Sequence, residues 1–372
     1  MATDTSRRGA LQKLASLAAA GTVLSLYNPA RLLATEIGDN ERVSLLGCAK
    51  DAKGNFYAAV SDTGGRLLQR YPLPARGHGV AVQQHGDLAF AVARRPGKFI
   101  EAFNYKTGEH YASAVPGDGN YFYGHAVLSA DGNTLFATEG TFESSAGSIG
   151  VFDVRNGLTR SGEITGVGIG PHELALFDDD TLVVAVGGIH TRERKKLNLE
   201  TMEPSLVYVS LSKGKTIERV RLPDNQLSIR HLAVEDGLVV TGQQYQGDTD
   251  ETVLPLVATH RPGGEYRMLA ASWGEWRRFD GYVASVTVTD KIIVATSPRG
   301  NCYGCWDRDT GLLLSLSSLS DAAGASGSGD VWLSSGIGRV VRLKEEKVMG
   351  KVGRSQSYGD VMWDNHLTAV IN

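Results

Sequence analysis

The 372-residue sequence lacks the features that mark several large classes of protein. Its three cysteines are too few for a disulfide scaffold and leave one thiol unpaired. A formal net charge of −3 gives no basic surface of the kind that binds nucleic acid. With 42% hydrophobic and 21% charged residues and only 11 prolines, the composition is that of a globular protein, apart from a surplus of glycine. We therefore expect a folded protein with no nucleic-acid partner.

Recognisable catalytic signatures are also missing. The sequence contains no Gly-x-Ser-x-Gly elbow, no phosphate-binding loop and no His-Glu-x-x-His pair. After residue 40, no segment has the periodicity of a long amphipathic helix. Any site must therefore be assembled by the fold from separate parts of the chain.

Residues 1–35 differ from the rest of the chain. Arg7 and Arg8 precede an apolar run from about Leu14 to Leu26, which is too short for a membrane span of about 20 residues. The pattern predicts a twin-arginine export signal, with an ordinary secretory signal or a basic amphipathic start as the alternatives. We therefore expect a periplasmic protein, cleaved near Ala34, with no membrane span in its mature form.

Beyond residue 40 the chain repeats one pattern: a short strand, a turn rich in Asp, Gly and Asn, and a second β-branched strand. Histidines at the head of successive units lie 47, 47 and 59 residues apart, a spacing typical of propeller blades. We predict an all-β fold over residues 40–372, a single seven-bladed β-propeller with four-stranded antiparallel blades. Strands near both termini would close the ring. A stack of β-sandwiches is the alternative, but no linker separates the units.

The histidines that head these units are His78, His125, His172 and His231. In a propeller they would form an arc at the channel mouth, provided that their strands share one register. Clustered imidazoles suit iron, copper or zinc. Nearby repeat positions add candidate ligand-binding residues, and the arginines among them favour an anionic ligand over a bare cation: Arg76, Arg94, Glu139, Glu173, Arg230 and Tyr282. The alternative is that the histidines only brace the blades.

Two insertions and a cysteine pair depart from the repeat. Residues 187–204 and 245–257 lengthen two units, and insertions on a propeller often shape its binding face. Cys302 and Cys305 have the spacing of a redox or zinc motif. We expect them in a loop between strands, where a local disulfide is favoured because a second pair of zinc ligands is missing.

Together these motifs resemble a bacterial family of unknown function. The resemblance rests on the ordered series RGHGVAV from Arg76, RRPG from Arg94, YGHAVLSADG from Tyr123, GIGPHEL from Gly168, LSIRHLAV from Leu227 and SPRG from Ser297. It implies an exported seven-bladed propeller, encoded beside imelysin-type peptidases and other iron-uptake proteins. The chain departs from the family pattern at His190 to Glu193 and at Ala323–Gly324, which both touch possible ligand positions.

Three functions remain open at this stage. The first is a periplasmic binding or accessory protein that holds a metal or metal chelate at the His/Arg-lined mouth, in connection with iron acquisition. The second is a metal-dependent, lactonase-like hydrolase that uses Glu139, Glu173 and the histidines. The third is a platform for protein–protein interaction.

Overall fold

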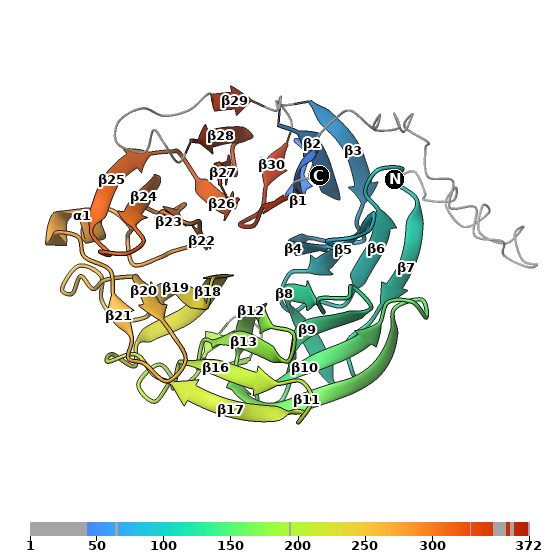
Figure 1. Cartoon of the computed structure of the whole chain (residues 1–372), viewed down its shortest axis with the longest axis horizontal. Helices are drawn as coiled ribbons and strands as arrows, with labels where there is room; N and C mark the ends of the chain where they lie inside the picture. Colours follow the sequence, from blue (N-terminus) through green and yellow to red (C-terminus); the bar gives the residue numbers. More distant parts are fainter. Residues whose placement is uncertain are drawn as a thin grey trace, which may run out of the picture. The chain divides into compact units, whose positions relative to one another are not determined.

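The computed structural model describes residues 43–63, 66–192, 195–327, 329–344, 355–357 and 361–370. The predicted export signal, residues 1–35, lies outside these residues. Apart from one two-stranded hairpin, the described strands form seven antiparallel sheets arranged as blades around a central axis (Figure 1). The predicted all-β, seven-bladed propeller is therefore confirmed. No helix in these segments is long and apolar enough to cross a membrane.

Blades 1 to 4 run from the N-terminal strands to the middle of the chain. Blade 1 contains β1 (Val43–Lys50), β2 (Phe56–Asp62) and β3 (Leu67–Pro72), and blade 2 contains β4 (Gly77–Val82), β5 (Leu88–Ala93), β6 (Ile100–Asn104) and β7 (His110–Ala114). Blade 3 contains β8 (Asn120–Leu128), β9 (Thr134–Thr141), β10 (Ala146–Asp153) and β11 (Thr159–Ile169). Blade 4 contains β12 (Pro171–Asp178), β13 (Thr181–Val186), β16 (Ser205–Ser210) and β17 (Lys215–Val220).

Blades 5 to 7 complete the circle. Blade 5 contains β18 (Leu227–Glu235), β19 (Leu238–Tyr245), β20 (Val257–His260) and β21 (Arg267–Met268), followed by the short helix α1 (Trp273–Arg277). Blade 6 contains β22 (Ser285–Val288), β23 (Ile292–Ser297), β24 (Cys302–Asp307) and β25 (Leu313–Ser318). Blade 7 contains β26 (Ala322–Ser326), β27 (Val331–Ser335), β28 (Arg339–Leu343) and β29 (Ser355–Ser357).

The ring is closed by the C-terminal strands. β30 (Met362–Trp363) and β31 (Thr368–Ala369) both pair with β1, so they occupy the inner position of blade 1. Leu45 lies opposite Ala369 and Ala49 lies opposite Trp363. This is the predicted closure, in which the two ends of the chain together build one blade.

The core lies between neighbouring blades. Successive side chains of a strand point to opposite faces of its sheet, and β5 shows the consequence. Ala89 and Ala91 pack in an apolar cluster with residues of blade 1, whereas Phe90 and Val92 pack in a cluster with residues of blade 3. Each blade is therefore apolar on both faces, which explains the near-continuous runs of small and β-branched residues in the sequence.

The cysteine prediction is wrong on both points. Cys302 and Cys305 lie within strand β24 rather than in a loop, and both are free and buried. Residues three apart on a strand point to opposite faces: Cys302 joins the core cluster on one side of blade 6, and Cys305 joins the cluster on the other side. A local disulfide would have to pass through the sheet.

Candidate functional site

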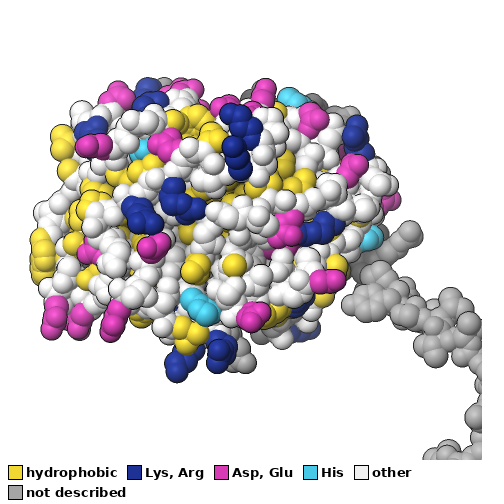
Figure 2. All heavy atoms as spheres, turned by 90° about the horizontal axis from the view of Figure 1, so that it is seen from below, with side chains coloured by type: hydrophobic (Ala, Val, Ile, Leu, Met, Phe, Trp, Pro, Cys, Tyr) yellow, Lys and Arg dark blue, Asp and Glu magenta, His cyan; other side chains and the backbone are white. Residues whose placement is uncertain are grey.

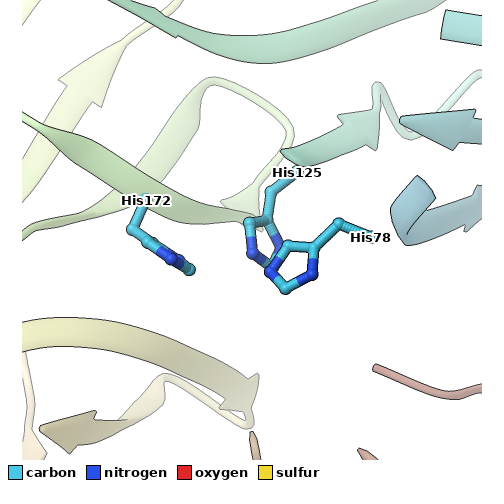
Figure 3. Close-up of side chains that lie close together, drawn as sticks. All are labelled: His78, His125 and His172. Carbon is cyan, nitrogen blue, oxygen red and sulfur yellow. The ribbon is translucent and has the colours of Figure 1, made fainter. Parts of the chain in front are cut away.

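The four histidines predicted from the repeat meet at the propeller axis. Ring centroids are 4.9 Å apart for His78 and His125, 4.8 Å for His125 and His172, and 5.0 Å for His172 and His231. Figure 3 shows the first three rings pointing toward one another from β4, β8 and β12. His78, His125 and His231 are almost fully buried.

Each of these histidines lies at or beside an irregularity of its inner strand. The pairing register shifts between Gly77 and Val80, between Phe122 and Ala126, between Pro171 and Leu174, and between Ile229 and His231. A β-bulge changes the direction of the side chains around it. A β-bulge therefore recurs in the inner strands of four consecutive blades, at or beside the residues that carry the imidazoles.

A fifth histidine, His366, completes the cluster, and the sequence analysis missed it. It lies between β30 and β31, and its ring centroid is 4.6 Å from that of His78, 4.4 Å from His125 and 4.9 Å from His231. A signal was present, because the stretch from His366 to Val370, HLTAV, is similar to HLAV at His231. The histidine ring, defined as His78, His125, His172, His231 and His366, therefore draws on five consecutive blades.

Two carboxylates orient three of the five rings. Asp364 accepts a hydrogen bond of 2.7 Å from Nδ1 of His78 and pairs with Nε of Arg76 at 2.6 Å. Glu173 accepts from Nδ1 of His231 at 3.2 Å, and its other oxygen lies 3.6 Å from Nδ1 of His125. A carboxylate at Nδ1 fixes the tautomer that leaves Nε2 as the free lone pair.

Burial keeps most of the ring uncharged. Loss of hydration lowers the pKa of His125, His172, His231 and His366 well below 6.5, and repulsion among the rings adds to the effect. Burial also raises the pKa of Glu173. It acts to raise the pKa of Asp364 too, but the hydrogen bond from His78 and the charge of Arg76 outweigh it and hold that pKa well below its usual range.

Three nitrogens of the histidine ring are buried and have no hydrogen-bond partner among the described residues. They are Nε2 of His125, Nδ1 of His172 and Nε2 of His366. Two overlapping sets bring three ring nitrogens within 4.8 Å of one another, His78–His125–His172 and His125–His231–His366. Because metal–nitrogen bonds are about 2 Å long, small ring rotations would bring either set around one transition-metal ion.

The contact that links neighbouring blades at this point involves the backbone of the histidines and not their imidazoles. The Thr138 hydroxyl on β9 donates to the carbonyl oxygen of His172 at 2.8 Å and lies 3.4 Å from that of His125. This hydroxyl links blades 3 and 4 through the backbone. The imidazoles themselves contact one another and the two carboxylates, which a purely structural role does not require.

A cavity of about 350 Å³ opens against the histidine ring. Three of the predicted ligand-binding residues, Arg94, Arg230 and Tyr282, line it. The sequence analysis missed Arg95, Lys196, Arg299 and Asn365, which also line it. Lys196 belongs to the hairpin of β14 (Thr191–Arg192) and β15 (Lys195–Lys196), which is part of the insertion over residues 187–204.

Arg76 and Glu139 lie apart from this cavity. Arg76 reaches the site only through Asp364 and lines a neighbouring pocket of about 200 Å³. Glu139 is fully buried, pairs with Arg160 on β11 at 2.5 Å, and accepts a hydrogen bond from Asn120 at 2.9 Å. Glu139 was expected beside the histidines, but strand alternation places it on the face of blade 3 opposite to that of Thr138, where Arg160 and Asn120 hold its carboxylate.

Comparison with known proteins supports the fold and the family. The structure of U3-55K has a TM-score of 0.58 and 12% identity, with 78% of this chain and 85% of that chain covered. The crystal structure of BamB from Moraxella catarrhalis has a TM-score of 0.50 and 14% identity, with 86% and 92% covered. No curated protein matches the sequence. A family described as "Protein of unknown function (DUF1513)" matches residues 71–370, and the chain belongs to this family.

Proposed function

We propose that the chain is a periplasmic binding protein that holds a first-row transition-metal ion in the histidine ring. The observation that carries this proposal is the set of three buried ring nitrogens without partners, on imidazoles that burial keeps neutral. A buried polar atom without a partner costs free energy, and a neutral imidazole nitrogen is a preferred ligand of iron, copper and zinc.

The carboxylates support the same interpretation. Metal-ligating histidines usually donate their second ring nitrogen to a carboxylate or carbonyl, which orients the ring and increases its basicity. Asp364 and Glu173 stand in this relation to His78 and His231. Neither carboxylate is needed as a ligand, because the ring offers five imidazoles.

The proposed link is to iron acquisition, with imelysin-type proteins of the periplasm as partners. It rests on the resemblance of the sequence motifs to a family encoded beside such proteins and on the twin-arginine pattern, which is typical of proteins exported after folding. Iron is therefore the first metal to test, followed by copper and zinc.

The site favours binding over hydrolysis. Glu139, one of the two carboxylates considered for a hydrolase, is held by Arg160. Glu173, the other, accepts hydrogen bonds from His231 and from the backbone N–H of Leu232 at 3.1 Å. An interaction platform would expose one large apolar area; the part of the rim that Figure 2 shows edge-on carries interspersed charges of both signs and gives such a platform no support on that side.

Metal analysis of mature protein purified without a histidine tag tests the proposal. We expect about one iron, copper or zinc ion per chain, lost in the double variant His125→Ala/His366→Ala and kept in the exposed-site control His85→Ala. Co²⁺ loading of the unaltered protein provides a second measurement, since nitrogen ligands give intense visible absorption bands in a tetrahedral site. Absence of metal after loading with each of the four ions would refute the proposal.

A further inference from the structure

We infer that the cavity against the histidine ring binds a small oligo-anion, a molecule with two or more carboxylate or phosphate groups. This site adjoins the proposed metal ligands, and its charge comes from cationic side chains of separate parts of the chain.

Five cationic side chains line the cavity: Arg94, Arg95, Lys196, Arg230 and Arg299. They come from the segment after β5, the β14–β15 hairpin, strand β18 and the segment after β23. None of the lining residues in the described part of the chain is acidic. Two carboxylates beside the histidine ring, Asp364 and Glu173, are engaged by His78 and His231. Among the described residues, positive charge therefore predominates in the lining of the cavity.

Three of these cations have neutral partners among the described residues. Arg95 donates to the Thr191 hydroxyl at 3.2 Å, and Lys196 donates to the side chain of Gln246 at 2.5 Å. The Arg299 guanidinium lies over the ring of Tyr282, 5.1 Å from its centroid. Like charges held close together in a partly buried site are unfavourable without a counter-charge. A bound anion would supply that counter-charge.

Arg230 is the clearest case in this cavity of a cation that lacks partners among the described residues. Its Nε is buried and has no hydrogen-bond partner in the described segments. Burial and then the charge of Arg230 lower the pKa of Lys196, so these cationic side chains repel one another. An arginine offers a planar fork of donors that matches a carboxylate or phosphate group.

Neutral donors would orient the ligand. Tyr123, Gln244, Tyr282 and Asn365 line the same cavity, and Asn365 donates to the Tyr282 hydroxyl at 2.9 Å. A cavity of about 350 Å³ is at the small end of the range for ligand sites. The fit is therefore to a compact molecule that carries several negative charges.

The cavity lies against the histidine ring, so an anion bound there would also lie beside a metal held by the ring. His78, His172 and His231 line it too, so the anion lies against the open side of the histidine ring. If the ring holds a metal, which is the proposed function on which this step rests, the anion completes its coordination. The positive charges of Arg95, Lys196, Arg230 and Arg299 repel a hydrated cation and attract its anionic complex. The site would thus select a chelated metal over the free ion.

Calorimetric titration of metal-free, full-length protein with citrate and, separately, with pyrophosphate tests the inference. The two arms distinguish carboxylate from phosphate ligands. We expect at least one to bind, with a Kd that rises with NaCl concentration because the contacts are ionic. Arg230→Gln and the double variant Lys196→Gln/Arg299→Gln should each weaken binding by about tenfold or more.

The matched control is Arg221→Gln, which removes one arginine from an exposed ion pair with Glu203 and should leave the Kd unchanged. The inference is overturned if neither anion binds the unaltered protein, with or without metal, or if the control weakens binding as much as the cavity variants do.

The variant His125→Ala/His366→Ala separates the two proposals. It should lose metal and keep anion binding, because neither residue lines the cavity. A protein that binds citrate or pyrophosphate but no metal would refute the proposed function and support the anion site. Metal binding without anion binding would overturn the anion site alone.

Discussion

Acidification from pH 7.5 to 5.5 should destabilise the metal-free protein through its histidine ring. Burial lowers the pKa of His125, His231 and His366, so the folded state does not take up protons that the unfolded chain binds near pH 6.5. On acidification, the free energy of unfolding decreases wherever the unfolded state binds more protons than the folded state. The loss should therefore begin near pH 7 and grow as the pH decreases.

The magnitude follows from proton linkage. A ring that stays neutral in the folded state loses about 1.4 kcal/mol relative to the unfolded chain over these two pH units. The three rings that are more than nine-tenths buried, those of His125, His231 and His366, together give about 4 kcal/mol, and the lowered pKa of the less buried His172 adds to this loss. The raised pKa of Glu173 acts in the opposite sense and reduces this loss, whereas Asp364 stays ionised throughout. We expect a net loss of several kcal/mol, from about 4 kcal/mol before the opposing effect of Glu173.

Urea denaturation at the two pH values, on protein stripped of metal, measures this difference. His366→Asn removes one titrating ring and should reduce the pH-dependent loss by about 1.4 kcal/mol. His85→Asn, at an exposed position, should leave it unchanged. A loss below about 1 kcal/mol in the unaltered protein, or equal effects of the two variants, would refute the view that the ring is held neutral.

Two further predictions concern the backbone around the ring. Gly124→Ala should cost about 1–3 kcal/mol in urea denaturation, because Gly124 has a φ of 111° and a Cβ would lie 2.6 Å from Cδ2 of His78. Gly119→Ala, with a φ of 74° and no atom within 4 Å of its Cβ, should show the smaller cost of the backbone alone. Thr138→Val should cost about 1 kcal/mol by the same assay, since it removes the hydroxyl that bonds to the carbonyl of His172; no change would show that this link does not stabilise the ring.

The sequence was sufficient to predict the architecture and four of the five histidines. The regular spacing of the units specifies a propeller, and a propeller brings equivalent positions of separate blades to one axis. The spacing alone does not reveal the bulges at His125 or His172, which arise from local pairing. The four histidines were nevertheless placed correctly relative to one another. Because a bulge recurs in each of the four units, their side chains all point toward the axis.

The rest of the site could not be predicted from the repeat, for physical reasons that differ between residues. His366 belongs to a blade split between the two ends of the chain, so no neighbouring period points to it. Arg95, Lys196 and Arg299 lie in connections or in the inserted hairpin, where the repeat gives no register. Glu139 was misplaced because one step along β9 reverses the sheet face: Thr138 faces blade 4 and the carbonyl of His172, whereas Glu139 lies on the opposite face with Arg160 and Asn120.

The position of His366 explains why blade 7 contributes no imidazole to the histidine ring. Blade 7 offers Gly324 instead of an imidazole on its inner strand, and a Cβ there would lie 2.5 Å from the backbone nitrogen of Leu367. On the other side, a Cβ at Gly47 of β1 would lie 2.9 Å from the carbonyl oxygen of His366. The closing segment therefore passes between two glycines, which leave room for its backbone. The same segment that closes the propeller, between β30 and β31, also places His366 at the axis. A metal bound by this histidine would therefore also stabilise the closure of the propeller.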